Sequence, residues 1–363
     1  MAGINGSGGA VSNMRVDEQS QAQRIICGDR AASPTNIAES RQCDPLDRAG
    51  ARLGPCPEKG VILRASEALG AVRLIVRRAN GGNGYMRSIQ FTLLPAPDIL
   101  KKDVECFRIA HYRGEEGFAL TVSPNGRPGI VFQQNNGQSP VETIITPSRS
   151  TGSIPTVYIY GQTTEPGVMN HKKGPYTTVQ VILKPHALQT LLGINASALT
   201  HVLVELHEFS APSLPEQLLE ASNEQEQIAL LTSFLVAQLK QEKPRDALVE
   251  ESLRLIHQHI GAIQVKSLLD HLNISERQFE RRFSQTVGVP PQLYIRMKRF
   301  NEAVRLMKTG QFEALTAVAH ALGFHDQSHF IRDIKALSGM TPTSLSHKAD
   351  DFHHGQAGYF YLA

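Results

Sequence analysis

Several features that would assign the chain to a particular class of protein are scarce or absent. The 363 residues include only four cysteines (Cys27, Cys43, Cys56 and Cys106), which have neither CxxC spacing nor the density of a disulfide scaffold. No uninterrupted apolar run approaches the ~18 residues of a membrane span, and the N-terminus lacks the apolar core of a signal peptide. The net charge of +3 is too small to identify a partner. We therefore expect a soluble, cytoplasmic protein with no membrane contact.

Large apolar side chains are missing from the first 85 residues. This segment has no Phe, its only aromatic residue is Tyr85, and it carries ten Arg but one Lys, whereas the rest of the chain has fourteen Arg and twelve Lys. So few large apolar side chains cannot easily offset the entropy of ordering the segment. Residues 1–85 are therefore predicted to be disordered, with room for a short helix or strand in "VILRASEALGAVRLIVRR". The alternative is that they lie upstream of a true translation start at Met86.

Short β-type runs occupy residues 86–210. Runs such as "SIQFTLL", "GIVFQQ", "TVYIYG" and "TTVQVIL" are rich in β-branched and aromatic residues, and turns such as "PNGRPG" and "HKKGP" separate them. Several short strands at this spacing predict a sandwich or barrel.

A helical linker region is predicted over residues 211–244. Ile228, Leu231, Leu235 and Leu239 form an apolar stripe on its helix, which we interpret as core packing rather than a dimer seam. At the other end of the chain, residues 349–363 have no motif that we can interpret and are predicted to be a tail.

Residues 245–348 are helical in pattern and contain an internal repeat. The stretch 268–291 aligns with 318–342 when one extra residue is allowed in the second turn. Each copy has a short helix, a tight turn, a second helix, a glycine and a proline-started helix, which is a helix-turn-helix. The predicted fold class is therefore α+β, a β-rich sandwich or barrel followed by an all-α domain with two helix-turn-helix units. The matched pairs include Leu272 with Leu322, Phe279 with Phe330, Phe283 with Ile334, Gly288 with Gly339 and Pro291 with Pro342.

One long helix, predicted from Pro290 to Lys308, joins the two units. At ~1.5 Å per residue it spans about 28 Å, and successive major-groove faces on one side of B-DNA lie ~34 Å apart. Residues 266–308 carry nine Lys/Arg against four Asp/Glu, and this local charge of +5 favours contact with a phosphate backbone.

The sequence "HDQSH" (325–329) looks like the HExxH zinc motif of a metalloprotease, but the repeat indicates another role. In the first copy Ser275 caps the second helix, with Gln278 completing a capping box, and Asp326 is the counterpart of Ser275. His325 then precedes the helix, so it does not share with His329 the i, i+4 face that a metal pair needs. We therefore predict neither a metal nor any other cofactor, and interpret this sequence as the start of a second recognition helix.

The outward positions of both second helices fit contact with DNA. Arg bonds bidentately to guanine, Gln to adenine, and Glu accepts from the cytosine amino group. A solvated charged face is the alternative for one such helix, but two in register favour base recognition. The candidate base-contacting residues are Arg277, Glu280, Arg281, Gln327, Ser328 and Arg332. The candidate phosphate-contacting residues are Arg282, His329 and Lys335.

At "LNISERQFERRFSQTVGVPPQLYI" and "ALGFHDQSHFIRDIKALSGMTP" the chain resembles the AraC/XylS family of bacterial transcription regulators. The resemblance covers about 100 residues and implies the same base-contacting roles for the residues given above. Ile334 and Leu337 depart from it, standing where aromatic residues are frequent, and Pro290 is an additional proline at the start of the connecting helix.

The N-terminal part resembles the sensor domains of this family more weakly, through "NGRPGIVFQQ", "YIYGQTTEP" and "VQVILKPHALQTLLGINASALT". Such β-rich, cupin-like domains bind a small effector, mediate dimerisation, or both. Inward polar groups on the strands, Tyr158, Tyr160 and Tyr176, are candidate effector contacts, with ordinary strand packing as the alternative. The implied partners are double-stranded DNA, a small-molecule effector, RNA polymerase if the protein is an activator, and a second copy of the chain.

Two other functions compete with a DNA-binding regulator controlled by an effector. A β-barrel enzyme fused to a DNA-targeting module would need a compact metal set or a nucleophile motif. The histidines of the β region are scattered, no GxSxG or P-loop occurs, and Cys106 lacks catalytic partners, so we predict that the protein is not an enzyme. The β region can instead be a ligand-free protein-interaction module, which a small-molecule thermal-shift screen would distinguish.

Overall fold

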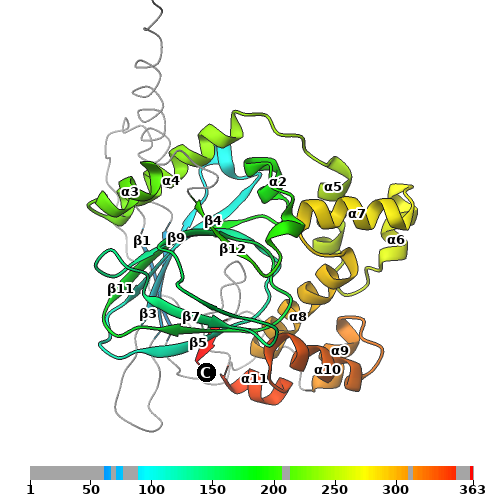
Figure 1. The fold of residues 1–363 in the computed structure, drawn as a ribbon. Coiled ribbons are helices and arrows are strands. Elements are labelled where there is room, and N and C mark those ends of the chain that lie inside the picture. Colours follow the sequence, from blue (N-terminus) through cyan, green and yellow to red (C-terminus); the bar gives the residue numbers. More distant parts are fainter. Residues whose placement is uncertain are drawn as a thin grey trace, which may run out of the picture.

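The computed structural model describes residues 61–66, 71–76, 89–206, 213–309, 314–348 and 360–362. A β-rich part lies beside a helical part that follows it in sequence (Figure 1). This architecture confirms the predicted α+β class.

Two facing sheets form the β-rich part, which corresponds to the sandwich in the prediction of a sandwich or barrel. Among the described residues, one sheet has the order β1-β2-β3-β4-β11-β6-β9-β12 and the other has the order β13-β5-β10-β7-β8. The strand pairings are antiparallel. The strands from residue 89 to residue 205 are β3 (Ile89–Pro95), β4 (Val104–Tyr112), β5 (Phe118–Val122), β6 (Gly129–Gln134), β7 (Val141–Ile145), β8 (Ser150–Gly152), β9 (Val157–Tyr160), β10 (Gly167–His171), β11 (Tyr176–Leu183) and β12 (Leu203–Glu205).

Both faces of the larger sheet are covered, and side chains alternate between them. In β4, Phe107 and Ile109 enter one core, whereas Ala110 and Tyr112 enter another that includes residues of β5. In β9, Ile159 lies with the first core and Tyr158 lies on the opposite face, toward the smaller sheet.

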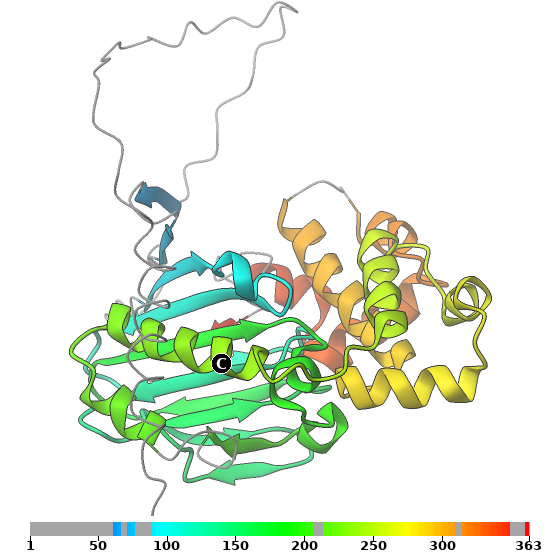
Figure 2. The same ribbon diagram turned by 90° about the horizontal axis from the view of Figure 1, so that it is seen from above.

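Helices cover the outer face of the larger sheet, and Figure 2 shows them lying across its strands. Leu231 and Leu235 are fully buried in this core and Ile228 is nearly so, which confirms that the apolar stripe of the linker region packs in the core. The covering elements are α2 (Ala187–Leu192), the 3-10 helix η2 (Ala196–Leu199), α3 (Ser213–Glu220) and α4 (Glu224–Leu239).

Both the segment predicted to be disordered and the predicted tail contribute strands. Those of the first lie in "VILRASEALGAVRLIVRR", where a short helix or strand was expected, whereas the strand in the tail was not predicted. Within the segment predicted to be disordered, β1 (Val61–Ser66) and β2 (Ala71–Val76) form a hairpin, and β2 pairs with β3. Residues 1–60, 67–70 and 77–88 lie outside the described residues. In the predicted tail, β13 (Phe360–Leu362) pairs with β5 and extends the smaller sheet, so these three residues are part of the fold.

The helical part has one apolar core shared by both helix-turn-helix units. Its first unit contains α6 and α7, its second contains α9 and α10, and α8 joins them. The helices are α5 (Ala247–Gln258), α6 (Val265–Leu272), α7 (Glu276–Val287), α8 (Pro291–Thr309), α9 (Leu315–Ala321), α10 (Gln327–Ser338) and α11 (Pro342–Lys348).

The connecting helix α8 begins and ends one residue later than predicted and is anchored to both units. Its Arg299 donates to the carbonyls of Ile260 and Ile263, just before α6. On the other side, Arg296 pairs with the buried Asp333 of α10 at 2.8 Å. Helix α8 therefore holds both units in place.

Candidate nucleic-acid interface and its junction with the β domain

The first recognition helix, α7, begins after Ser275 as predicted, but the predicted capping box is not formed. The Ser275 hydroxyl donates to Oε1 of Gln278 at 3.1 Å and accepts no backbone N–H. The tight turn between α6 and α7 begins at Asn273, whose left-handed backbone (φ 48°) ends α6.

The faces of α7 are divided as the sequence predicts. Phe279 and Phe283 are fully buried, with ring centroids 5.5 Å apart, whereas Arg277, Glu280 and Arg281 are exposed. The apolar face packs the helix on the core and leaves its polar face toward solvent.

The second recognition helix, α10, starts inside "HDQSH" and resolves the role of that sequence. The Asp326 carboxylate accepts the backbone N–H of His329 at 2.7 Å and is the predicted N-cap. His325 precedes the helix, and its Nδ1 lies 3.1 Å from the Asp326 carboxylate. Phe330 and Ile334 are fully buried, whereas Gln327, Ser328 and Arg332 are exposed.

Of the three predicted phosphate contacts, Arg282 forms an ion pair within the protein instead. Its Nε and Nη2 donate to the two carboxylate oxygens of Asp246 at 2.8 and 2.7 Å. Such a bidentate pair fixes the guanidinium, so Arg282 has a structural role here. His329 and Lys335 are exposed on α10, and the role of each in phosphate binding stays a prediction.

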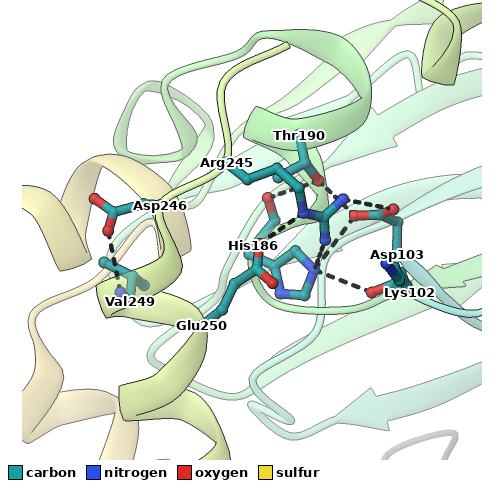
Figure 3. Close-up of polar contacts among 8 residues, drawn as sticks. All are labelled: Lys102, Asp103, His186, Thr190, Arg245, Asp246, Val249 and Glu250. Atoms are coloured by element: carbon teal, nitrogen blue, oxygen red, sulfur yellow. Dashed lines mark hydrogen bonds and ion pairs between the residues drawn. The ribbon is translucent and has the colours of Figure 1, made fainter. Parts of the chain in front are cut away.

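A buried charged cluster joins the β domain to the chain entering the helical part (Figure 3). Asp103, just before β4, is fully buried and accepts from Thr190 at 2.6 Å and from Arg245 at 3.0 Å. His186 Nε2 lies 3.3 Å from the same carboxylate. Burial by itself would raise the pKa of Asp103, but hydrogen bonds from these three side chains hold it well below its usual range.

Arg245 and its neighbour Asp246 extend this cluster to the first recognition helix. Arg245 also donates to Glu250 of α5 at 2.8 Å. Asp246 caps α5 by accepting the Val249 N–H, and the same carboxylate holds Arg282 of α7. Two consecutive residues thus link the β domain, α5 and α7, which we call the Arg245–Asp246 junction.

The C-terminal end of α7 also packs directly on the β domain. Gly288 ends the helix with φ 101°, and its carbonyl accepts from the Thr200 hydroxyl. A Cβ at Gly288 would lie 3.1 Å from the carbonyl oxygen of Ala196. Glycine is therefore required both by the backbone angle and by the close approach.

A loop of the β domain, residues 123–128, contacts the connecting helix. A Cβ built at Gly126 would lie 3.0 Å from the Tyr294 ring and 3.2 Å from the Lys298 side chain. Burial, and to a smaller extent the positive charge of nearby Arg127, lowers the pKa of Lys298 to about 7. The loop therefore packs closely against α8 at Gly126.

A cavity of about 180 Å³ opens between the two sheets, beside the same loop. Tyr158 and Tyr160 line it, as do Arg108 and Arg127. Tyr176 does not, because it lies in a separate aromatic cluster, stacked near Phe118 and His171. The prediction of Tyr176 as an effector contact therefore finds no support in this cavity.

Sequence reasoning missed the three arginines that line the cavity, Arg108, Arg127 and Arg149, and the Arg245–Asp246 junction. A signal for Arg108 was present, because an arginine within the apolar strand "CFRIAHY" shares the inward face of Ala110 and Tyr112. No local signal marks Arg245, whose partner Asp103 is 142 residues away.

Three further observations concern Cys106, possible metal ligands and helices that could span a membrane. Burial raises the pKa of Cys106 to about 11, so this residue is a thiol rather than a reactive thiolate. Within the described ranges, no group of three or more His, Cys, Asp or Glu is placed to hold a metal ion. None of the helices described here is both long enough and apolar enough to cross a bilayer.

Comparison with known families identifies two regions of the chain. Residues 268–348 match the model of a helix-turn-helix domain, and residues 92–205 match a domain of unknown function. A transcriptional activator, RhaS of Pectobacterium carotovorum, is 34% identical over 83 residues, 23% of this chain and 29% of that protein. A probable transcriptional regulator, LumQ of Photobacterium leiognathi, is 30% identical over 155 residues, 41% of this chain and 60% of that protein. The matches thus span less than two thirds of these relatives.

Solved structures add distant similarities. ToxT from Vibrio cholerae aligns with 66% of this chain and 98% of its own, at 15% identity and a TM-score of 0.40. The DNA-binding domain of AdpA in complex with a target DNA aligns with 28% of this chain, at 22% identity and a TM-score of 0.27. At these scores the similarity is too small to bear on function.

Proposed function

We propose that this chain, whose residues 268–348 are an AraC-type helix-turn-helix domain, is a sequence-specific DNA-binding transcriptional regulator whose β domain controls the DNA-binding part. It acts in the bacterial cytoplasm, where it places α7 and α10 in adjacent major grooves. The relatives named as transcriptional activators favour activation, with RNA polymerase as a partner. A second copy of the chain, in a homodimer, is a further proposed partner.

The observation that carries this proposal is the equivalence of α7 and α10. Both helices bury an apolar face in the same core and expose an arginine at matching repeat positions, Arg281 and Arg332. Both are held to α8, whose 19 residues span about 28 Å. Two recognition helices on such a rod suit two half-sites about one helical turn apart.

Base recognition is assigned to the exposed polar residues of the two helices. In α7 these are Arg277, Glu280 and Arg281, and in α10 they are Gln327, Ser328 and Arg332. His329 and Lys335 would contact phosphates beside them. Arg282 is not included because Asp246 holds it.

The β domain is proposed to sense a small effector in the cavity between its sheets. Tyr158 and Tyr160 line this cavity, and the loop that carries Arg127 at its edge contacts α8 through Gly126. A coupling of about 1–3 kcal/mol between the two sites is typical of such control.

Selection of random duplex DNA with the full chain tests the proposal. We expect two sequence blocks separated by about one helical turn, with Arg281→Ala relaxing one block and Arg332→Ala relaxing the other, each at about 1–3 kcal/mol. Arg254→Ala is the control because Arg254 is an exposed arginine of α5 bonded to Glu251 and Gln258 of its own helix. It removes the same charge and should leave both blocks unchanged.

Binding that depends on salt but not on sequence would contradict the proposal. In that case Arg281→Ala, Arg332→Ala and Arg254→Ala would all weaken binding similarly, because each removes one positive charge from a nonspecific electrostatic contact.

A further inference from the structure

We propose that His329 contacts a DNA phosphate only when its imidazole is protonated, and that Asp333, held by Arg296, is the positioning residue for this contact. DNA affinity then rises as the pH falls through the range in which histidines take up a proton. The inference rests on the proposed function, since it assigns a role to a residue beside the base-contacting face of α10.

His329 lies on a flank of α10, between its outward and its buried faces. Successive residues of a helix are turned by ~100°, so this side chain points between those of the exposed Arg332 and the buried Asp333. A helix about 10–12 Å across fills a major groove ~12 Å wide. Its outward side chains then meet base edges, and its flanks meet the phosphates that border the groove. His329, whose side chain is 47% exposed, is therefore placed for a phosphate.

The buried carboxylate of Asp333 is shared between α8 and this histidine. Its Oδ1 lies 2.8 Å from Nη2 of Arg296, and its Oδ2 lies 3.7 Å from Nε2 of His329. The Asp333 side chain is only 7% exposed, so solvent screens these interactions little. Because Arg296 belongs to α8, it fixes the carboxylate, and the carboxylate in turn attracts the Nε2 edge of the imidazole.

An aromatic contact also holds the imidazole ring. The rings of His329 and Phe324 have centroids 5.6 Å apart and meet at 79°, and Phe324 belongs to the core of the helical part. Among the residues that the structure describes, Nδ1 of His329 has no hydrogen-bond partner. Nε2 therefore faces Asp333, and Nδ1 is left for a partner outside the chain.

Only the protonated imidazole can interact with Asp333 and bind a phosphate at the same time. A neutral imidazole has one N–H donor, whereas the imidazolium has two. If the proton on Nε2 faces Asp333, Nδ1 has a proton for the phosphate only in the charged form. Formation of the phosphate contact thus takes up a proton, and this linkage raises the DNA affinity as the pH falls.

The other charges around His329 largely offset each other. Asp326 accepts the His329 backbone N–H through Oδ1, and its Oδ2 lies 3.1 Å from Nδ1 of His325. On α8, burial lowers the pKa of Arg299 and the charge of Asp333 opposes this, so Arg299 also lies within electrostatic reach of that carboxylate. The positive N-terminal end of α10 disfavours an imidazolium. An adjacent phosphate adds the negative charge that favours it.

Binding of a short mixed-sequence duplex to the full chain tests the inference, because a phosphate contact does not depend on the operator sequence. Affinity is measured over a range of salt concentrations at about pH 6 and about pH 8, between which histidines change charge. We expect binding to be severalfold tighter at the lower pH. The slope of log K against log salt should be steeper there by ~0.9, the value for one more neutralised phosphate.

Two substitutions of the exposed His329 assign the effect to this residue. His329→Gln should lose the change in slope between the two pH values. His329→Lys should keep the steeper slope at both, because an ammonium group stays charged throughout this range. His271→Gln is the matched control, since Nε2 of His271 also lies near a carboxylate, 3.8 Å from Glu251, but on α6 rather than on a recognition helix. It should behave as the wild type.

Asp333→Asn tests the positioning residue. It should shift the rise in affinity to lower pH, because it removes the carboxylate that favours the imidazolium, whereas a purely structural role would lower the affinity by the same factor at every pH. If this variant misfolds, the two exposed His329 variants still decide whether the contact exists.

Three results would overturn the inference: equal salt slopes of the wild type at both pH values, a change in slope that survives in His329→Gln, or one that His271→Gln abolishes. A uniform loss of affinity in Asp333→Asn would overturn the role of Asp333. A wild type that binds the duplex at neither pH would instead contradict the proposed function itself, so the two failures are distinguishable.

Discussion

Replacing Arg245 with methionine is expected to destabilise the protein in a pH-dependent way. Arg245 donates to Asp103 across the junction between the β domain and the helical part, and the Asp103 side chain is 1% exposed. Methionine has a similar length but neither charge nor donors. The variant therefore leaves Asp103 with Thr190 and His186 but without the guanidinium.

The magnitude follows from the burial of the two partners. A hydrogen bond to a charged group contributes about 1.5–3 kcal/mol, and breaking a buried pair destabilises by about 3–5 kcal/mol. Arg245 is 33% exposed, so solvent screens part of the interaction and we expect the lower end, about 2 kcal/mol. At roughly 2–4 °C per kcal/mol for a chain of this size, the Tm falls by about 6 °C.

The sign of the pH dependence follows from the lowered pKa of Asp103. A carboxyl whose pKa is lower in the folded state stabilises the fold above its ordinary pKa, and this stabilisation is lost as the pH falls below that value. The difference between the wild type and Arg245→Met is therefore largest near neutral pH. It should shrink below about pH 4, where the unfolded aspartate takes up its proton.

Chemical denaturation at neutral and acidic pH measures this difference. Arg254→Met is the control because Arg254 is 51% exposed and pairs with Glu251 on its own helix, so its stability should stay close to that of the wild type. Asp103→Asn combined with Arg245→Met removes both charges and should recover part of the loss. A loss in Arg245→Met no larger than in the control, or one that persists unchanged in acid, would refute the reasoning.

Three further predictions concern other parts of the fold. Asp326→Ala removes the cap of α10 and should lower the Tm, whereas Asp326→Asn, which can still accept the backbone N–H, should keep most of the wild-type Tm in the same thermal melt. Gly288→Ala should lower the Tm more than Gly339→Ala, because both have positive φ but only the first Cβ meets a β-domain carbonyl, at 3.1 Å; equal losses would argue against that contact. Burial lowers the pKa of His171 to about 4, so stability should fall as the pH drops from about 6.5 to 4, and His171→Phe should flatten that acid slope in denaturation at several pH values.

Sequence periodicity was sufficient to predict which residues of the helical part face inward, because each helix has its own pattern of apolar residues. The inward placement of Phe279 and Phe330 follows from the 3.6-residue spacing of apolar side chains. The cap at Asp326 is a hydrogen bond to the N–H of His329, only three residues later in the chain. The same local information was incomplete at Ser275, where the hydroxyl bonds the Gln278 side chain instead of the backbone. A bond from Ser275 to the backbone and one to the Gln278 side chain span similarly few residues. The sequence does not show which of the two is more stable.

In the β domain, the two-residue period predicted which side chains share a face but not which of them surround a cavity. Tyr158, Tyr160 and Tyr176 all face the smaller sheet, yet only the first two line the cavity. The position of a cavity depends on how a second sheet covers the first, and strand alternation carries no information about that.

The sequence by itself determined the two helix-turn-helix units, their inward and outward residues and the two-part organisation of the chain, since these follow from short-range periodicity and caps. Only the tertiary structure decided that Arg282 pairs with Asp246, that Arg245 reaches Asp103, and that a loop at the edge of the cavity contacts α8. The paired residues lie 36 and 142 positions apart. Packing between distant elements brings them together, and no local pattern encodes such a meeting.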